Sequence, residues 1–173
     1  MMKDFNFKIC LIGMPGSGKT TLGKEVAVFF DYDFIDIDSL IREKTGSKIS
    51  DIFSNKGEKY FRALETKILN SVILENKKLI ISTGGGIILK NKEILNRTYN
   101  IYLKCNIGTL VKRLSLSKER PLIGKNISDN VKQMLSNREI LYKKSSNAIV
   151  DANTSKKTII KNIIEIITNE NNK

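Results

Sequence analysis

The stretch GMPGSGKT, residues 13–20, decides the fold of this chain, and it directly follows the apolar run FKICLI, residues 7–12. It fits the pattern G-x-x-x-x-G-K-[ST], in which glycines let backbone N–H groups fold around a phosphate chain. The pattern requires a strand before the loop and a helix after it. Both are expected, because FKICLI has the composition of a buried strand and residues 20–30 have helical periodicity. The stretch therefore predicts a site for the phosphates of a nucleotide.

Each part of this loop has a predicted role in holding ATP. Lys19 should reach the β- and γ-phosphates, and the Thr20 hydroxyl should be a ligand of Mg²⁺. The N-terminus of the following helix adds partial positive charge. The dinucleotide pattern G-x-G-x-x-G does not fit the loop, which argues against NAD. The residues of this segment that we expect to bind ATP are Gly13, Met14, Pro15, Gly16, Ser17, Gly18, Lys19, Thr20 and Thr21.

The length and composition favour an ordinary soluble globular protein. A chain of 173 residues favours a single domain, residues 1–173. No apolar run approaches the ~20 residues of a membrane span, and the N-terminus lacks the features of a signal peptide. We therefore expect a complete cytoplasmic protein without a membrane partner. Histidine is absent, which excludes Ser-His-Asp catalysis and HExxH zinc sites.

The chain is strongly basic, with a net charge of +12 from 30 Lys+Arg against 18 Asp+Glu. This charge is compatible with nucleic-acid binding, with anionic substrates, or with lysines dispersed over the surface. The lysines are spread along the whole sequence, which favours dispersion. Aromatic residues make up 7% and no R-G-F stacking motif occurs, so we expect no nucleic-acid partner.

Short apolar runs alternate with helical stretches along the chain. This alternation predicts an α/β fold, a parallel sheet with helices on both faces. Ligands of such sheets bind at the carboxyl ends of the strands. The predicted strands are residues 7–12, 33–38, 78–82, 100–105 and 148–152.

Two aspartates end the second predicted strand. The third predicted strand ends without an acid, so Asp36 is the candidate to hold Mg²⁺ through water, together with Thr20. Asp38 should accept a hydrogen bond from a substrate hydroxyl and orient it towards the γ-phosphate. The alternative is that Asp38 only caps the next helix. We expect Ser39 to cap that helix and Gly46 to end it.

Two further features of the sequence indicate functional positions: a glycine triplet and a polar segment that contains Arg120. Gly84, Gly85 and Gly86 end a buried strand, which indicates a backbone that approaches a ligand closely. Arg120 lies in LSKERPLIGKN between two predicted helices. We expect a lid at about residues 115–126 that closes on ATP. Arg62, by itself, has the spacing of a surface ion pair with a glutamate one turn later.

The order and spacing of several motifs resemble the shikimate kinase family over nearly the whole chain. The phosphate loop is generic, but D-x-D, G-E-x-x-F-R-x-x-E, G-G-G and R-P-L together are specific to that family. The resemblance implies a P-loop kinase fold with a lid and a five-stranded parallel sheet of order 2-3-1-4-5. It also implies transfer of the γ-phosphoryl group of ATP to the 3-hydroxyl of shikimate, in aromatic amino-acid biosynthesis. The motifs are GMPGSGKTTLGK, DIDSLI, TGSKISDIF, GEKYFRALE, STGGG, RPLI, NREILY and VDAN.

The resemblance also implies roles for single residues. Lys19, Asp38 and Arg120 would be catalytic, and Mg²⁺ would accompany ATP as the cofactor. Glu65 would brace Arg62. The residues that would bind shikimate are Asp38, Arg62, Gly84, Gly85, Gly86 and Arg138. Besides the phosphate loop, Arg113, Arg120 and Asn153 would bind ATP, with Arg113 stacked on adenine. We expect a monomer, and we keep one alternative: another small P-loop kinase, acting on gluconate or a nucleoside monophosphate.

Overall fold

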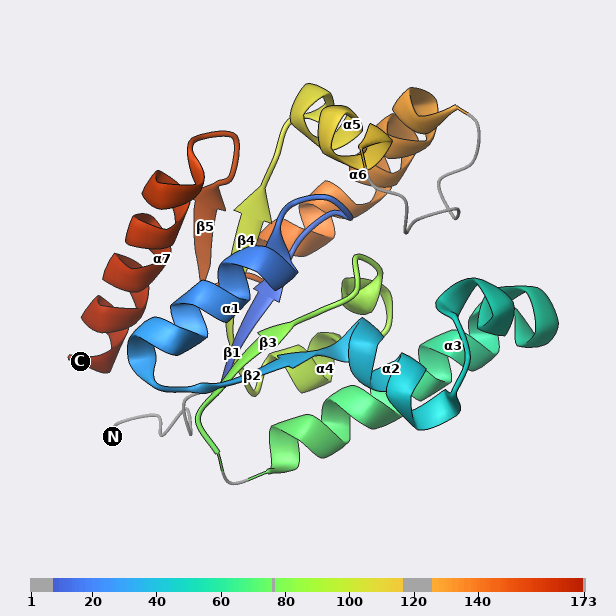
Figure 1. Ribbon diagram of the computed structural model, residues 1–173, viewed down its shortest axis with the longest axis horizontal. Helices are drawn as coiled ribbons and strands as arrows, with labels where there is room; N and C mark the ends of the chain where they lie inside the picture. The colour runs from blue at the N-terminus through green and yellow to red at the C-terminus, as the bar shows by residue number, and fades with distance from the viewer. Residues whose placement is uncertain (1–7, 76, 117–125, 173) are drawn as a thin grey trace.

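The computed structural model describes residues 8–75, 77–116 and 126–172 of the chain. The predicted lid, including Arg120, lies almost wholly outside the described residues. Strands and helices alternate along the chain (Figure 1). The strands are β1 (Lys8–Ile12), β2 (Asp33–Asp36), β3 (Leu79–Ser82), β4 (Tyr99–Lys104) and β5 (Ala148–Asp151). The helices are α1 (Lys19–Phe30), α2 (Ile37–Thr45), α3 (Ile49–Leu74), α4 (Lys92–Leu95), α5 (Ile107–Ser115), α6 (Ile127–Ser145) and α7 (Lys156–Asn171), with the 3₁₀-helix η1 (Ile87–Leu89).

The five strands form one parallel sheet in the order β2-β3-β1-β4-β5, which confirms the predicted order. The register sets the strand ends side by side. Ser82, the last residue of β3, pairs with Leu11 of β1 on one side and with Asp36 of β2 on the other. The end of β2 and the loop after β1 therefore lie at the same edge of the sheet.

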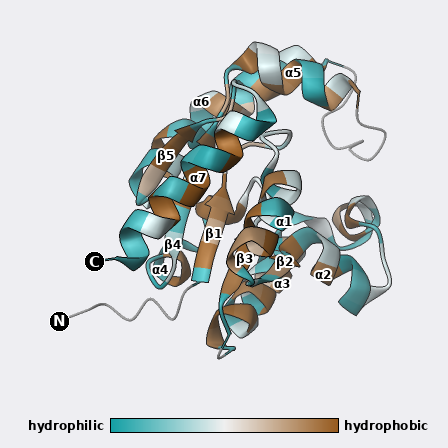
Figure 2. Ribbon diagram, turned by 60° about the vertical axis from the view of Figure 1, so that its left-hand side comes forward, coloured by the Kyte–Doolittle hydropathy of each residue, from teal (hydrophilic) through white to brown (hydrophobic). Residues whose placement is uncertain are grey.

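The core lies between the sheet and two layers of helices. α1 and α7 cover one face, and α3, α4 and α6 lie on the other (Figure 1). β1 is buried along its whole length and is apolar after Lys8, as its brown colour in Figure 2 shows. α7 buries Ile159, Ile163 and Ile167, spaced four residues apart, on one face of the helix. No helix in the described part of the chain has the length and apolarity needed to cross a membrane.

The second strand is shorter than the sequence pattern predicts. β2 ends at Asp36, and α2 begins at Ile37, so Asp38 lies in the first turn of a helix and not in a strand. The N-cap is Asp36, whose Oδ1 accepts a hydrogen bond from the Ser39 N–H at 2.9 Å. The prediction that Ser39 caps this helix is wrong, and so is the alternative that Asp38 does. The predicted end at Gly46 is confirmed, with φ 64 in the left-handed region.

Candidate active site

The phosphate loop adopts the conformation that its glycines allow. Gly13, Gly16 and Gly18 all have positive φ, which L side chains rarely adopt. Gly18 directly precedes α1. Lys19 is only 6% exposed, and its Nζ donates to the carbonyl oxygens of Gly13 at 2.8 Å and Met14 at 2.9 Å. The ammonium group is therefore held inside the loop.

An oxygen-rich corner lies at the start of α1. Thr20 Oγ1 donates to Asp36 Oδ2 at 2.7 Å and lies 3.2 Å from Ser82 Oγ. Burial alone would raise the pKa of Asp36. Hydrogen bonds from Thr20, Ser39 and Ser82 outweigh burial and hold this pKa below its ordinary value. The corner thus keeps one ionised carboxylate beside two hydroxyls.

This corner fits Mg²⁺ bound together with a nucleotide. Mg²⁺ prefers oxygen ligands and keeps several waters, so one carboxylate, a hydroxyl and phosphate oxygens suffice. Among the residues that the structure describes, no group of three or more His, Cys, Asp or Glu is placed to hold a metal ion. The residues of this corner that could hold the ion are Thr20 and Asp36, the two residues predicted for it, with Ser82 beside them.

Arg62 is held by two carboxylates of very different exposure. Its Nη1 donates to Glu65 Oε2 at 2.8 Å, and its Nη2 lies 3.2 Å from Glu58 Oε1. Glu65 is fully buried, whereas the Glu58 side chain is 61% exposed. Burial raises the pKa of Glu65, although the adjacent Arg62 charge opposes that shift. The Arg62 side chain is 13% exposed, so it is largely withdrawn from water, and its ion pairs fix its orientation.

The glycine triplet after β3 packs directly against these charged side chains. A Cβ atom on Gly84 would lie 2.6 Å from Glu65 Oε1 and 2.9 Å from Asp38 Oδ1. A Cβ atom on Gly86 would lie 2.3 Å from Arg62 Nη2. The sequence pattern indicated a close approach at this point. The structure shows that the groups closest to these glycines are the side chains of Glu65, Asp38 and Arg62.

Gly85 lies between α6 and the phosphate loop. Its carbonyl oxygen accepts hydrogen bonds from Tyr142 Oη and, at 3.3 Å, from Arg138 Nη1, both on α6. A Cβ atom on Gly85 would lie 2.6 Å from Pro15 Cδ in the phosphate loop. The triplet thus lies between the phosphate loop and the cluster of Asp38, Arg62 and Arg138.

Of the three other residues predicted to bind ATP, Arg120 lies outside the described residues, and Arg113 and Asn153 lie near the ends of β4 and β5. Arg113 donates to the Ala152 carbonyl at 3.0 Å and to the carbonyls of Gly16 and Ser17 at 3.4 Å. Asn153 Oδ1 accepts from the Asn106 N–H at 2.9 Å. Both residues thus lie where β4 and β5 end.

Two residues of the site were missed by the sequence patterns. Ser82 stands at the end of β3, where many phosphate-loop proteins have an aspartate, so its position was the signal. Tyr142 follows Arg138 by four residues, which on a helix puts both on one face. That spacing in NREILY could have identified it.

A phosphate loop with an oxygen-rich corner faces two arginines and an aspartate across a glycine triplet, and this arrangement is typical of a P-loop kinase of small molecules. Comparison with known proteins gives the family. The family model described as shikimate kinase matches residues 15–168. The chain belongs to the shikimate kinase family, whose members are ATP-dependent phosphotransferases.

Individual relatives agree along nearly the whole chain. The chain is 42% identical over 151 residues to a shikimate kinase of Clostridium botulinum (strain Okra / Type B1), covering 84% of this chain and 88% of the relative. It is 38% identical over 163 residues to one of Sulfurihydrogenibium sp., covering 92% and 95%. The solved structure of shikimate kinase from Acinetobacter baumannii in complex with shikimate is similar with a TM-score of 0.89, at 32% identity, over 98% of each chain.

Proposed function

We propose that this protein transfers the γ-phosphoryl group of ATP to the 3-hydroxyl of shikimate. The observation that carries the proposal is the cluster of Asp38, Arg62 and Arg138 around the glycine triplet, directly beside the phosphate loop. Shikimate is a small ring that bears one carboxylate and three hydroxyls. Arginine forks bind carboxylates with defined orientation, and an aspartate accepts hydrogen bonds from hydroxyls. The cluster has the groups that this acceptor requires.

The phosphate loop would bind the donor. The N–H groups around Gly16 and Gly18 and the N-terminus of α1 would hold the β- and γ-phosphates, and Lys19 would turn from the Gly13 and Met14 carbonyls to the phosphates. Thr20 and Asp36 would hold Mg²⁺, which neutralises charge on the phosphates when bound. Arg113 and Asn153 would contact the adenosine end.

The acceptor would be fixed by charge and hydrogen bonds. Arg62 and Arg138 would bind the carboxylate of shikimate. The N–H groups of Gly84, Gly85 and Gly86 would contact ring hydroxyls. Asp38 would then orient the reacting hydroxyl in line with the γ-phosphate and take its proton late in the transfer.

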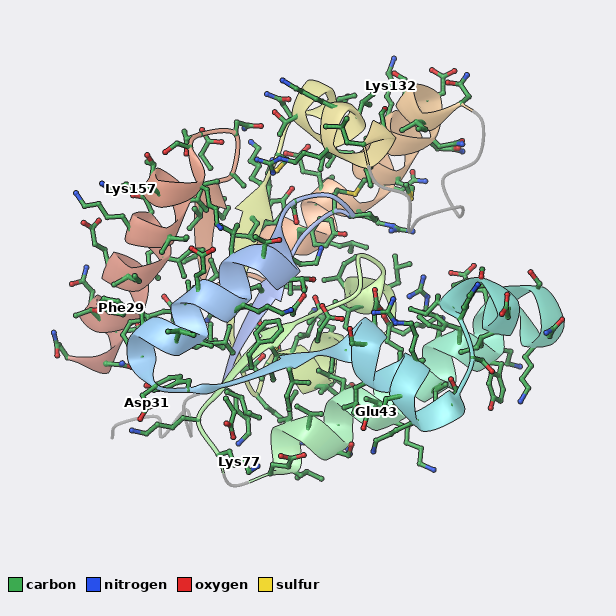
Figure 3. The ribbon with its side chains drawn as sticks, in the orientation of Figure 1. Phe29, Asp31, Glu43, Lys77, Lys132 and Lys157 are labelled. Carbon is green, nitrogen blue, oxygen red and sulfur yellow. The ribbon has the colours of Figure 1, made fainter. Side chains whose placement is uncertain are left out.

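Positioning and charge would supply most of the rate acceleration in this direct transfer, without a covalent enzyme intermediate. Lys19 would neutralise the transferring group. Arg120 would do so from the predicted lid, which lies outside the described residues. We further propose a cytoplasmic monomer with no nucleic-acid partner. Dispersed charge supports the last point, because Lys77, Lys132 and Lys157 are exposed on different sides of the molecule (Figure 3).

A coupled assay of ADP release tests the proposal. The purified protein is incubated with Mg-ATP and one acceptor at a time: shikimate, gluconate, or a nucleoside monophosphate. We expect turnover with shikimate and a value of kcat/KM at least about 100-fold lower with the other two, since neither acceptor matches both the arginine pair and the ring hydroxyl contacts. Preferred turnover of gluconate or of a nucleotide would refute the proposed acceptor while leaving the phosphate loop's role intact.

A further inference from the structure

Tyr142 is a buried tyrosine whose hydroxyl has a specific partner at the edge of the acceptor site. The residue is fully buried in α6, and its Oη donates to the carbonyl oxygen of Gly85. Its ring stacks on Tyr102 of β4, with centroids 5.0 Å apart and an interplanar angle of 18°. Stacking fixes the ring, so the hydroxyl is aimed at one point of the glycine triplet.

Tyr142 and Arg138, which belongs to the proposed shikimate site, donate hydrogen bonds to the same carbonyl oxygen. Arg138 Nη1 lies 3.3 Å from the same Gly85 oxygen. A carbonyl oxygen has two lone pairs, and here one serves the hydroxyl and the other the guanidinium group. If the hydroxyl were removed, the partly buried Gly85 oxygen would lose one donor, and Arg138 would be drawn further onto it. The guanidinium group would then be less available to a substrate carboxylate.

The hydroxyl also orients the peptide group between Gly85 and Gly86. A planar trans peptide points its C=O and its N–H in opposite directions. Because the Gly85 C=O points at α6, the Gly86 N–H points away from α6. Among the described residues, this N–H donates to no other backbone carbonyl. Gly86 itself lies against the Arg62 guanidinium group, so the N–H is held next to the acceptor site.

We propose that Tyr142 is a positioning residue for the acceptor: its hydroxyl holds the Gly85–Gly86 peptide so that the Gly86 N–H faces the substrate and Arg138 stays free for the substrate carboxylate. Tyr142 itself does not touch the substrate. The inference rests on the proposed function only for the identity of the acceptor.

The hydroxyl is a neutral donor over the whole pH range of an assay. Burial raises the pKa of Tyr142 far above its ordinary value, although the charge of Arg138 opposes this shift. The contribution of Tyr142 should therefore not change between mildly acidic and mildly alkaline pH. A pH-independent effect of Tyr142 can therefore be distinguished from the effect of a step that depends on a titrating carboxylate.

Tyr142→Phe tests the inference, because it removes the hydroxyl and keeps the stacked ring. Tyr102→Phe is the matched control. Tyr102 is 1% exposed and belongs to the same ring pair, but its hydroxyl is buried without a hydrogen-bond partner among the described residues. Steady-state kinetics of both variants give KM for shikimate, KM for ATP and kcat. Calorimetric titration with shikimate, run well below the melting temperature of each variant, gives the binding constant free of any loss of stability.

We expect Tyr142→Phe to raise KM and the dissociation constant for shikimate about tenfold, since the partly buried Gly85 carbonyl oxygen loses its hydroxyl donor. KM for ATP should stay within about twofold, and the effect should be the same at about pH 6.5 and pH 8.5. Tyr102→Phe should leave all constants within about twofold, because no hydrogen bond is lost. An unchanged KM for shikimate in Tyr142→Phe, or equal changes in both variants, would overturn the inference. If the wild type prefers a substrate other than shikimate, the proposed function fails. The role of Tyr142 is then tested by comparing KM for that substrate in Tyr142→Phe and Tyr102→Phe, with the same expected changes.

Discussion

Glu65→Ala should destabilise the protein far more than Glu58→Ala, although both glutamates bind the same arginine. Glu65 is fully buried and receives Arg62 Nη1 at 2.8 Å, whereas Glu58 has an exposed fraction of 61% and lies 3.2 Å from Arg62 Nη2. Water can replace the Glu58 carboxylate but cannot reach the place of Glu65. The two variants therefore remove the same kind of group from the same cation in opposite environments.

The expected losses in free energy of unfolding differ severalfold between the two variants. Removing one partner of a buried ion pair costs about 3–5 kcal/mol, because the remaining charge stays buried and unpaired. Arg62 keeps some exposure, 13%, and keeps Glu58, so we expect the lower end, about 3 kcal/mol. For a chain of this size, that corresponds to a melting temperature lower by about 6–12 °C. An exposed pair contributes at most about 1 kcal/mol, so Glu58→Ala should lower the melting temperature by no more than about 4 °C.

Urea unfolding followed by far-ultraviolet circular dichroism measures both free energies of unfolding, and thermal melts give the second estimate. The free energy of unfolding of Glu65→Gln should lie between those of the two alanine variants. Glutamine keeps the volume of the side chain and one hydrogen-bond acceptor for Arg62, but it removes the charge. Kinetics provide the functional readout. KM for shikimate should rise about tenfold in Glu65→Ala, since Arg62 loses its fixed orientation, and should hardly change in Glu58→Ala. Equal losses of stability in both alanine variants would refute the assignment of Glu65 as the buried support of Arg62.

Three further predictions concern neighbouring positions. Gly86→Ala should raise KM for shikimate about tenfold with KM for ATP unchanged, because its Cβ would displace the Arg62 guanidinium group; an unchanged KM would contradict this. Asp38→Asn should lower kcat about 100-fold or more while the melting temperature is retained, and near-normal turnover would remove Asp38 from the mechanism. Asp36 has a lowered pKa in the folded state, despite the opposing effect of burial. Its contribution to stability is therefore present above the ordinary pKa of 3.8 and lost as pH falls through the lowered value. Urea unfolding should accordingly show a deficit for Asp36→Asn at neutral pH that shrinks at about pH 3, and a deficit that grows on acidification would be inconsistent with this sign.

The phosphate loop and the alternation of strands and helices were predictable because their signals are local, whereas the strand order was implied by the resemblance to the family. Glycines at fixed spacing before Lys19 allow the positive φ angles that the loop adopts, and apolar runs of strand length alternate with helices. The error at residues 33–38 was also local in origin. DFIDID has strand-like alternation, but the Asp36 side chain captures the Ser39 N–H and starts α2 at Ile37. A side chain that bonds its own backbone competes with strand pairing, and the pattern of apolar residues does not register that competition.

The sequence by itself determined which chemical groups this protein has and the order in which the chain presents them: a phosphate loop, a pair of aspartates, three glycines and several arginines. Only the tertiary structure decided which of these groups are buried and which share a partner. Glu58 and Glu65 have equivalent helical spacings from Arg62, yet only Glu65 faces the core. Gly85 and Tyr142 are 57 residues apart, and they meet because α6 packs against η1, which directly follows the glycine triplet. Burial and long-range contact depend on how elements pack against one another, and no local pattern carries that information.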